Sequence, residues 1–176
     1  MFLKKLIICL AAVALPATVS AQERPDFETS TATALSVGEE YIDAYIARDW
    51  NRLAPLMADD VTFQDTTAQH VFGGVKHEGK DPLLVFFRKG YSGISRMEFA
   101  LDREFASSDN AIFEGTLDWD VDMGGGRIVS TSMPFVVVLT VHDGKVVSHR
   151  DYADYRPFLT ANEASMIAAG EAAGRD

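Results

Sequence analysis

Residues 96–155 read RMEFALDREFASSDNAIFEGTLDWDVDMGGGRIVSTSMPFVVVLTVHDGKVVSHRDYADY, and this stretch decides the fold. It divides into four long runs in which β-branched and aromatic residues recur at alternating positions: 96–106, 110–122, 127–141 and 145–155. Short segments of turn-forming residues separate the runs: Ser107-Ser108-Asp109, 123–126 and His142-Asp143-Gly144. Turns this short join neighbouring antiparallel strands, so the stretch predicts a curved antiparallel meander.

The preceding residues carry helical signals. Apolar side chains recur at helical spacing over residues 31–47, and Asp49 is placed to cap a second, shorter helix. Residues 61–65 alternate as a first strand, and the glycines in 66–79 predict a loop. Asp81-Pro82 then supplies the N-cap and first position of a third helix.

Two further signals complete the predicted architecture. Pro134 has no amide hydrogen, so its strand should start late, form a local edge or bulge there. Thr160 and Glu163 form a capping box that begins a C-terminal helix. The elements together predict an α+β fold: a cone-shaped, strongly curved antiparallel sheet with three N-terminal helices packed on its concave face, plus a short C-terminal helix.

The first 21 of the 176 residues have the pattern of a secretory signal peptide. A basic start at Lys4-Lys5 precedes an apolar run at 6–15 and the small-residue site Val19-Ser20-Ala21. We therefore expect a secreted or periplasmic protein without a membrane anchor, with a disordered lead-in at 22–29, one domain at 30–159 and a tail at 160–176. Cys9, the single cysteine, would leave with the signal peptide, which excludes disulfides and cysteine chemistry in the mature chain.

The charge balance bears on the partner. The chain has 16 basic and 26 acidic residues, a formal net charge of -10, and loss of Lys4 and Lys5 makes the excess of acid larger. A nucleic-acid-binding protein needs a basic face, so the composition argues against that partner. A small-molecule ligand that is neutral or cationic fits better.

Several motifs resemble the nuclear transport factor 2-like superfamily. They are Asp49-Trp50, ADDVTFQD at 58–65, Gly79-Lys80, Phe86-Phe87 and GKVVSHRDY at 144–152. The superfamily includes ketosteroid isomerases, limonene epoxide hydrolases and SnoaL-like polyketide cyclases. The resemblance covers residues 30–159 and implies a ligand cavity inside the cone, no cofactor, and a homodimer formed through the sheet.

Asp65 is the first candidate catalytic residue. It ends the predicted strand and alternates with Phe63, so one face of that strand supplies a carboxylate and an apolar wall. The resemblance to ketosteroid isomerases matches Asp65 to their general base and Tyr41 to their oxyanion tyrosine. Their second oxyanion donor, an aspartate, has no counterpart in 135–139. Two alternatives stay open: Asp65 caps the turn that follows it, and Tyr41 belongs to the core.

A second group lies on the last strands. Alternation places His149 with Asp151 on one face and Asp118 with Asp120 on one face, so all four are candidates to converge with Asp65. The resemblance to limonene epoxide hydrolases matches Asp120 and Asp151 to their catalytic aspartates, but their arginine falls on Asp118. The alternatives are that the acids of residues 118–122 point to solvent and that His149 is a packing residue.

These residues lead to two hypotheses of different class. The first is a protein that binds a small apolar ligand and performs cofactor-independent acid/base chemistry of the isomerase, cyclase or dehydratase type. Asp65, Asp151, Tyr41 and His149 would be catalytic, and Phe63, Phe87, Val136, Asp118 and Asp120 would line the ligand site. The second is a non-catalytic binding or assembly module of the same fold. We expect no metal site, because His70 and His77 lack a third ligand at a suitable spacing.

Overall fold

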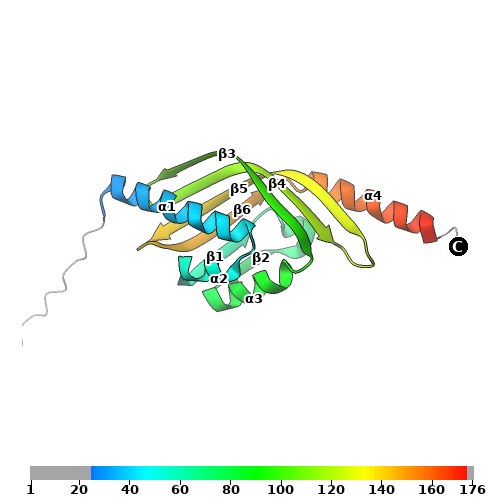
Figure 1. The fold of residues 1–176 in the computed structure, drawn as a ribbon, viewed down its shortest axis with the longest axis horizontal. Coiled ribbons are helices and arrows are strands. Elements are labelled where there is room, and N and C mark those ends of the chain that lie inside the picture. Colours follow the sequence, from blue (N-terminus) through cyan, green and yellow to red (C-terminus); the bar gives the residue numbers. More distant parts are fainter. Residues whose placement is uncertain (1–24, 174–176) are drawn as a thin grey trace, which may run out of the picture.

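Six strands form a single curved sheet with the order β2-β1-β6-β5-β4-β3 (Figure 1). The strands are β1 (Met57–Asp65), β2 (Val75–Glu78), β3 (Ile94–Ser107), β4 (Asn110–Asp122), β5 (Ile128–His142) and β6 (Lys145–Ala153). This computed structural model describes residues 25–173, so the predicted signal peptide, Cys9 and the first three residues of the lead-in lie outside the described residues. The four long runs of the sequence correspond to β3 to β6, which confirms the predicted meander.

The pairing of β1 differs from the prediction. β3, β4, β5 and β6 pair antiparallel in chain order, but β1 pairs parallel with β6, the last strand of the chain. The register places Phe63 beside His149 and Asp65 beside Asp151. The sheet is therefore mixed, and this one parallel pair joins the two ends of the domain.

Three helices precede the meander and pack on one face of the sheet, as predicted. α1 (Phe27–Ile46) crosses β3 to β6, α2 (Trp50–Leu53) follows it directly, and α3 (Lys80–Gly90) packs on β1 and β2. The buried core lies between these helices and the inner face of the sheet, where Phe113, Leu139 and Leu83 are fully enclosed. None of the described helices has the length and apolar content of a membrane span.

Several predicted boundaries were wrong. α1 begins at Phe27 because the Asp26 side chain accepts a hydrogen bond from the Thr29 amide, which shortens the expected lead-in. The expected loop at 66–79 contains a π-helical turn (Gln69–Gly73) and the edge strand β2. The C-terminal helix is longer than predicted: α4 spans Arg156–Ala173, packs against β5 and extends beyond the sheet in Figure 1.

Pro134 lies within β5, and the prediction of a local edge there is confirmed. Pairing of β5 with β6 begins only at Phe135, opposite Ala153, so the side of β5 next to Pro134 faces no strand. Pairing with β4 continues through Pro134, opposite Thr116. The Pro134 carbonyl accepts a hydrogen bond from the Asp154 amide, where the chain leaves β6.

Gly115 allows β3 and β4 to approach each other at the bend of the sheet. It pairs with Leu101, and the register of β3 against β4 shifts directly after that residue. A Cβ atom at position 115 would collide with the carbonyl oxygen of Ala100 and lie 3.0 Å from the Leu101 Cα. Both neighbours are backbone atoms, so no side-chain rotation relieves the clash.

We therefore predict that Gly115→Ala lowers the free energy of unfolding by about 1–3 kcal/mol, the usual cost of overpacking. Chemical denaturation of the purified protein measures this change. Gly170→Ala is the matched control, because Gly170 lies in α4 and a Cβ there meets no atom within 4 Å. Equal stability of the two variants would contradict the account of the bend.

Candidate functional site

A cavity of about 360 Å³ lies between the inner face of the sheet and α3. Its wall is largely aromatic and contains Phe63, Phe72, Phe86, Tyr91, Trp119 and Tyr155. Asp65 and His77 are further polar residues of the wall, and no Lys or Arg is among the residues that line it. A concave, mostly apolar site with a few polar groups is typical of small-molecule binding.

Asp65 is the carboxylate of this cavity. It ends β1 with 7% of its surface exposed. Oδ1 accepts hydrogen bonds from the amides of Thr67 and Ala68, at 3.0 and 2.8 Å, and from the Thr67 hydroxyl at 2.8 Å. The turn-capping interpretation is thus confirmed, and the same carboxylate lines the cavity. Its catalytic role stays a prediction.

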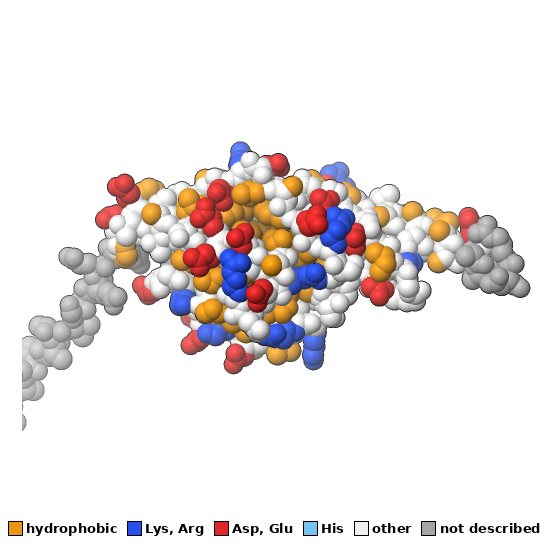
Figure 2. All heavy atoms as spheres, viewed as in Figure 1, with side chains coloured by type: hydrophobic (Ala, Val, Ile, Leu, Met, Phe, Trp, Pro, Cys, Tyr) orange, Lys and Arg blue, Asp and Glu red, His pale blue; other side chains and the backbone are white. Residues whose placement is uncertain are grey.

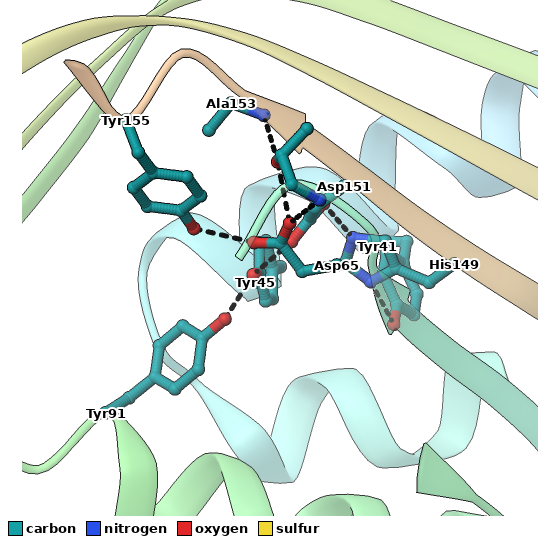
Figure 3. Close-up of polar contacts among 9 residues, drawn as sticks. Tyr41, Tyr45, Asp65, Tyr91, His149, Asp151, Ala153 and Tyr155 are labelled. Atoms are coloured by element: carbon teal, nitrogen blue, oxygen red, sulfur yellow. Dashed lines mark hydrogen bonds and ion pairs between the residues drawn. The ribbon is translucent and has the colours of Figure 1, made fainter. Parts of the chain in front are cut away.

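The second oxygen of Asp65 is held by Tyr155, as Figure 3 shows. The Tyr155 hydroxyl donates to Asp65 Oδ2 at 2.6 Å. Burial raises the pKa of Tyr155, and the negative charge of Asp65 raises it further. Tyr155 therefore remains a neutral hydrogen-bond donor at physiological pH.

His149 and Asp151 form a buried pair on β6, behind the cavity wall. They are 0% and 2% exposed, and His149 Nε2 lies 2.6 Å from Asp151 Oδ1. Since a carboxylate only accepts, Nε2 carries the hydrogen of this bond. On the other side of the ring, Nδ1 lies 3.1 Å from the Tyr41 hydroxyl. None of Tyr41, His149 and Asp151 lines the cavity, so the expectation that His149 and Asp151 converge there with Asp65 is wrong, and the alternatives of a packing His149 and a core Tyr41 fit the structure. A catalytic role for the three stays a prediction.

Two tyrosines connect this pair to the cavity (Figure 3). Tyr45 on α1 donates its hydroxyl hydrogen to Asp151 Oδ2 at 3.0 Å and lies 2.5 Å from the hydroxyl of Tyr91. Tyr91 follows α3 and lines the cavity. Burial raises the pKa of Tyr41, Tyr45 and Tyr91, with a further contribution in each from the charge of Asp151. All three phenols are thus neutral.

A phenol has one hydrogen to donate, and this fixes the direction of each bond. Tyr45 donates its hydroxyl hydrogen to Asp151, so Tyr91 is the donor in the hydrogen bond between the two tyrosine hydroxyls. Tyr155 likewise donates its hydroxyl hydrogen to Asp65. Tyr91, Tyr155 and Asp65 are all residues of the cavity wall, and neither tyrosine has a second hydroxyl hydrogen to donate to a ligand.

Three predicted ligand-site residues lie on the other face of the sheet. In β4 and β5 the buried positions include Leu117, Trp119 and Val137, so the alternating positions 118, 120 and 136 point away from the helices. Asp120 instead pairs with Arg96 of β3, with bonds of 2.9 and 3.0 Å. The prediction that Asp118, Asp120 and Val136 converge with Asp65 is therefore wrong.

The aromatic wall also differs in detail from the prediction. Phe87 is fully buried and stacks on Trp50 with ring centroids 5.0 Å apart, so it belongs to the core. Its neighbour Phe86 lines the cavity with Phe63. Sequence reasoning missed Tyr45, Tyr91, Tyr155 and Trp119 as site residues. The position of Tyr45 on the apolar face of the first helix could have indicated that it points into the fold. No local sequence pattern indicates that Tyr91, Tyr155 or Trp119 belongs to the site.

The described side chains hold no group of three or more His, Cys, Asp or Glu suited to a metal ion. Acidic and basic side chains are interspersed with hydrophobic ones on the face shown in Figure 2.

Comparison with known proteins identifies relatives of this fold. A search of the curated proteins finds no significant match. A candidate SnoaL-like polyketide cyclase from Shewanella putrefaciens has 19% identity and a TM-score of 0.65, over 73% of this chain and 95% of that chain. An LEH-like epoxide hydrolase from M. tuberculosis has 19% identity and a TM-score of 0.60, over 79% and 96%.

A third similar structure is a protein with a ketosteroid isomerase-like fold from Catenulispora acidiphila, solved in complex with trimethylamine. It has 15% identity and a TM-score of 0.59, over 71% of this chain and 90% of that chain. In sequence, the family described as the SnoaL-like domain matches residues 39–149, more than half of the chain. This protein therefore belongs to the SnoaL-like domain family and has its nuclear transport factor 2-like fold.

Proposed function

We propose that this protein binds a small, largely apolar molecule in the cavity and that Asp65 exchanges a proton with it. The observation that carries the proposal is a buried carboxylate in the wall of an aromatic cavity. Asp65 Oδ1 is fully used by the turn at Thr67 and Ala68, so Oδ2 is the oxygen that meets the ligand. A carboxylate held this firmly is well placed for proton transfer, because its position is fixed before the ligand arrives.

Asp151 and His149 act through Tyr45 and Tyr91 in this proposal. Asp151 is 2% exposed and does not line the cavity, so it is a positioning residue. It orients Tyr45, which in turn accepts the hydrogen of Tyr91 and holds that ring in the wall. Tyr41 supports the same network through His149 and does not reach the ligand.

The alternative is a ligand-binding protein without catalysis, and the direction of the hydrogen bonds favours it. Enolisation develops negative charge on a substrate oxygen, and that charge needs donors in the site. Tyr91 and Tyr155 donate inward, to Tyr45 and Asp65, and offer no hydrogen to the cavity. The Catenulispora acidiphila protein of similar fold was solved in complex with a small molecule, trimethylamine, which supports the binding part of the proposal.

Two further features are part of the proposal. Residues 1–21 direct export, so the protein acts in the periplasm or outside the cell.

The chain also forms a homodimer through the outer face of the sheet, where apolar side chains such as Ile112, Val136 and Val138 are only partly covered.

The dimer is tested by light scattering at micromolar concentration. We expect twice the mass of the mature chain for the unmodified protein. Val136→Glu should reduce this to the mass of one chain, because it places a carboxylate in the centre of the contact. A monomeric unmodified protein would contradict the dimer.

Catalysis is tested with Asp65→Asn. Asparagine retains an oxygen for the amides of Thr67 and Ala68, so we expect the melting temperature to change by a few degrees at most. In a screen of enolisable ketones and lactones, turnover should fall by about 10²- to 10⁴-fold, the usual contribution of a general base. Asp118→Asn is the matched control, because Asp118 lies on the outer face of the sheet, and its turnover should equal that of the unmodified protein.

Unchanged turnover in Asp65→Asn would rule out Asp65 as the proton-transfer group. Binding without turnover by the unmodified protein would instead support the non-catalytic alternative.

A further inference from the structure

The cavity wall presents an excess of hydrogen-bond acceptors. The hydroxyl hydrogens of Tyr91 and Tyr155 are committed to Tyr45 and Asp65, so both phenol oxygens and Asp65 Oδ2 can only accept from a ligand. A ligand polar group that meets these three oxygens must therefore be a donor. A ligand carboxylate placed there would meet lone pairs and the negative charge of Asp65.

The remaining polar side chains of the wall do not change this balance. The indole nitrogen of Trp119 has no hydrogen-bond partner, but the atom is enclosed and has no surface that faces the cavity. His77 stacks on Phe86 with ring centroids 4.0 Å apart, and its ring can donate or accept. Among the side chains of the wall, His77 can therefore supply one hydrogen-bond donor, against three oxygens that can only accept.

The charge of Asp65 is not neutralised by the protein around the cavity. No Lys or Arg is among the residues that line it, and no ion pair to Asp65 is found in residues 25–173. Four hydrogen bonds stabilise this buried carboxylate but bring no positive charge, so a cation brought by a ligand would supply the missing counter-charge.

The aromatic wall favours the same kind of ligand. Six aromatic rings surround the space, and the faces of such rings attract cations as well as hydrocarbon. The ring centroids of Phe63 and Phe86 are 5.9 Å apart, and those of Trp119 and Tyr155 are 6.3 Å apart, so neighbouring rings of the wall pack against each other. An organic ammonium ion satisfies both the acceptor oxygens and these rings.

We infer that the ligand of this cavity is a small organic ammonium ion whose nitrogen lies against Asp65 Oδ2 and the oxygens of Tyr91 and Tyr155, with its hydrocarbon part among the aromatic rings. The inference rests on the proposed function, because it assumes that the cavity holds a ligand.

The test compares three probes of nearly equal shape and different charge: 2-phenylethylammonium, 2-phenylethanol and phenylacetate. Binding to the mature protein is followed by NMR, using the indole signal of Trp119; Trp50, the other tryptophan, is packed in the core and serves as an internal reference. We expect the ammonium to bind at least 10-fold more tightly than the alcohol, and the carboxylate not to bind.

Asp65→Asn should remove the preference and bring the ammonium within about 3-fold of the alcohol. Asp118→Asn is the matched control, because it makes the same acid-to-amide change on the outer face of the sheet, away from the cavity, so the preference for the ammonium should persist. The comparison of probes on the unmodified protein stands even where a variant fails to fold.

The outcomes separate the inference from the proposed function. Equal or tighter binding of the alcohol or the carboxylate would overturn the ammonium assignment and leave ligand binding intact. If none of the three probes shifts the Trp119 signal at millimolar concentration, both the inference and the proposed binding function fail.

Discussion

The parallel pairing of β1 with β6 is the constraint on which the site depends. It places Asp65 beside Asp151 at the inner face of the sheet, where both side chains are buried. Buried carboxylates are costly unless hydrogen bonds replace the lost water. The structure meets this demand with tyrosines from three different parts of the chain: Tyr155 after β6, Tyr45 on α1 and, through Tyr45, Tyr91 after α3.

This arrangement couples the fold to the chemistry of the cavity. The phenols donate their hydroxyl hydrogens to the buried carboxylates or to one another, so Tyr91 and Tyr155 have no hydrogen left to donate to a ligand in the cavity. Asp65 also has both a structural and a cavity-lining role. Its Oδ1 accepts the hydrogen bonds of the turn after β1, and the residue lines the cavity. The polar wall is thus a consequence of how the two acids are buried.

Much of the fold was predictable because its signals are local. Alternation and short turns defined the four strands of the meander, and Asp65 stood out because it ends a strand beside Phe63. The partner of β1 was not predictable, since β6 lies more than 80 residues further along the chain. Alternation also left open which face of β4 and β5 meets the helices, which is why Asp118, Asp120 and Val136 were placed wrongly. Tyr91 follows α3 and Tyr155 follows β6, and only the assembled fold brings their hydroxyls to the acids.

The central claim is that the hydrogen-bonded network holds Tyr41, Tyr45, Tyr91 and Tyr155 as neutral phenols, and a spectrophotometric titration of tyrosine ionisation tests it most directly. The folded state retains these four protons above the pH near 10 at which an unfolded chain releases them, so the contribution of the four phenols to stability is constant below that pH and falls above it. The fall is about 1.4 kcal/mol per pH unit for each phenol. We expect four of the five tyrosines to ionise only together with the loss of the fold, as monitored by circular dichroism. Reversible ionisation of two or more tyrosines near pH 10 in a protein that remains folded would contradict the account.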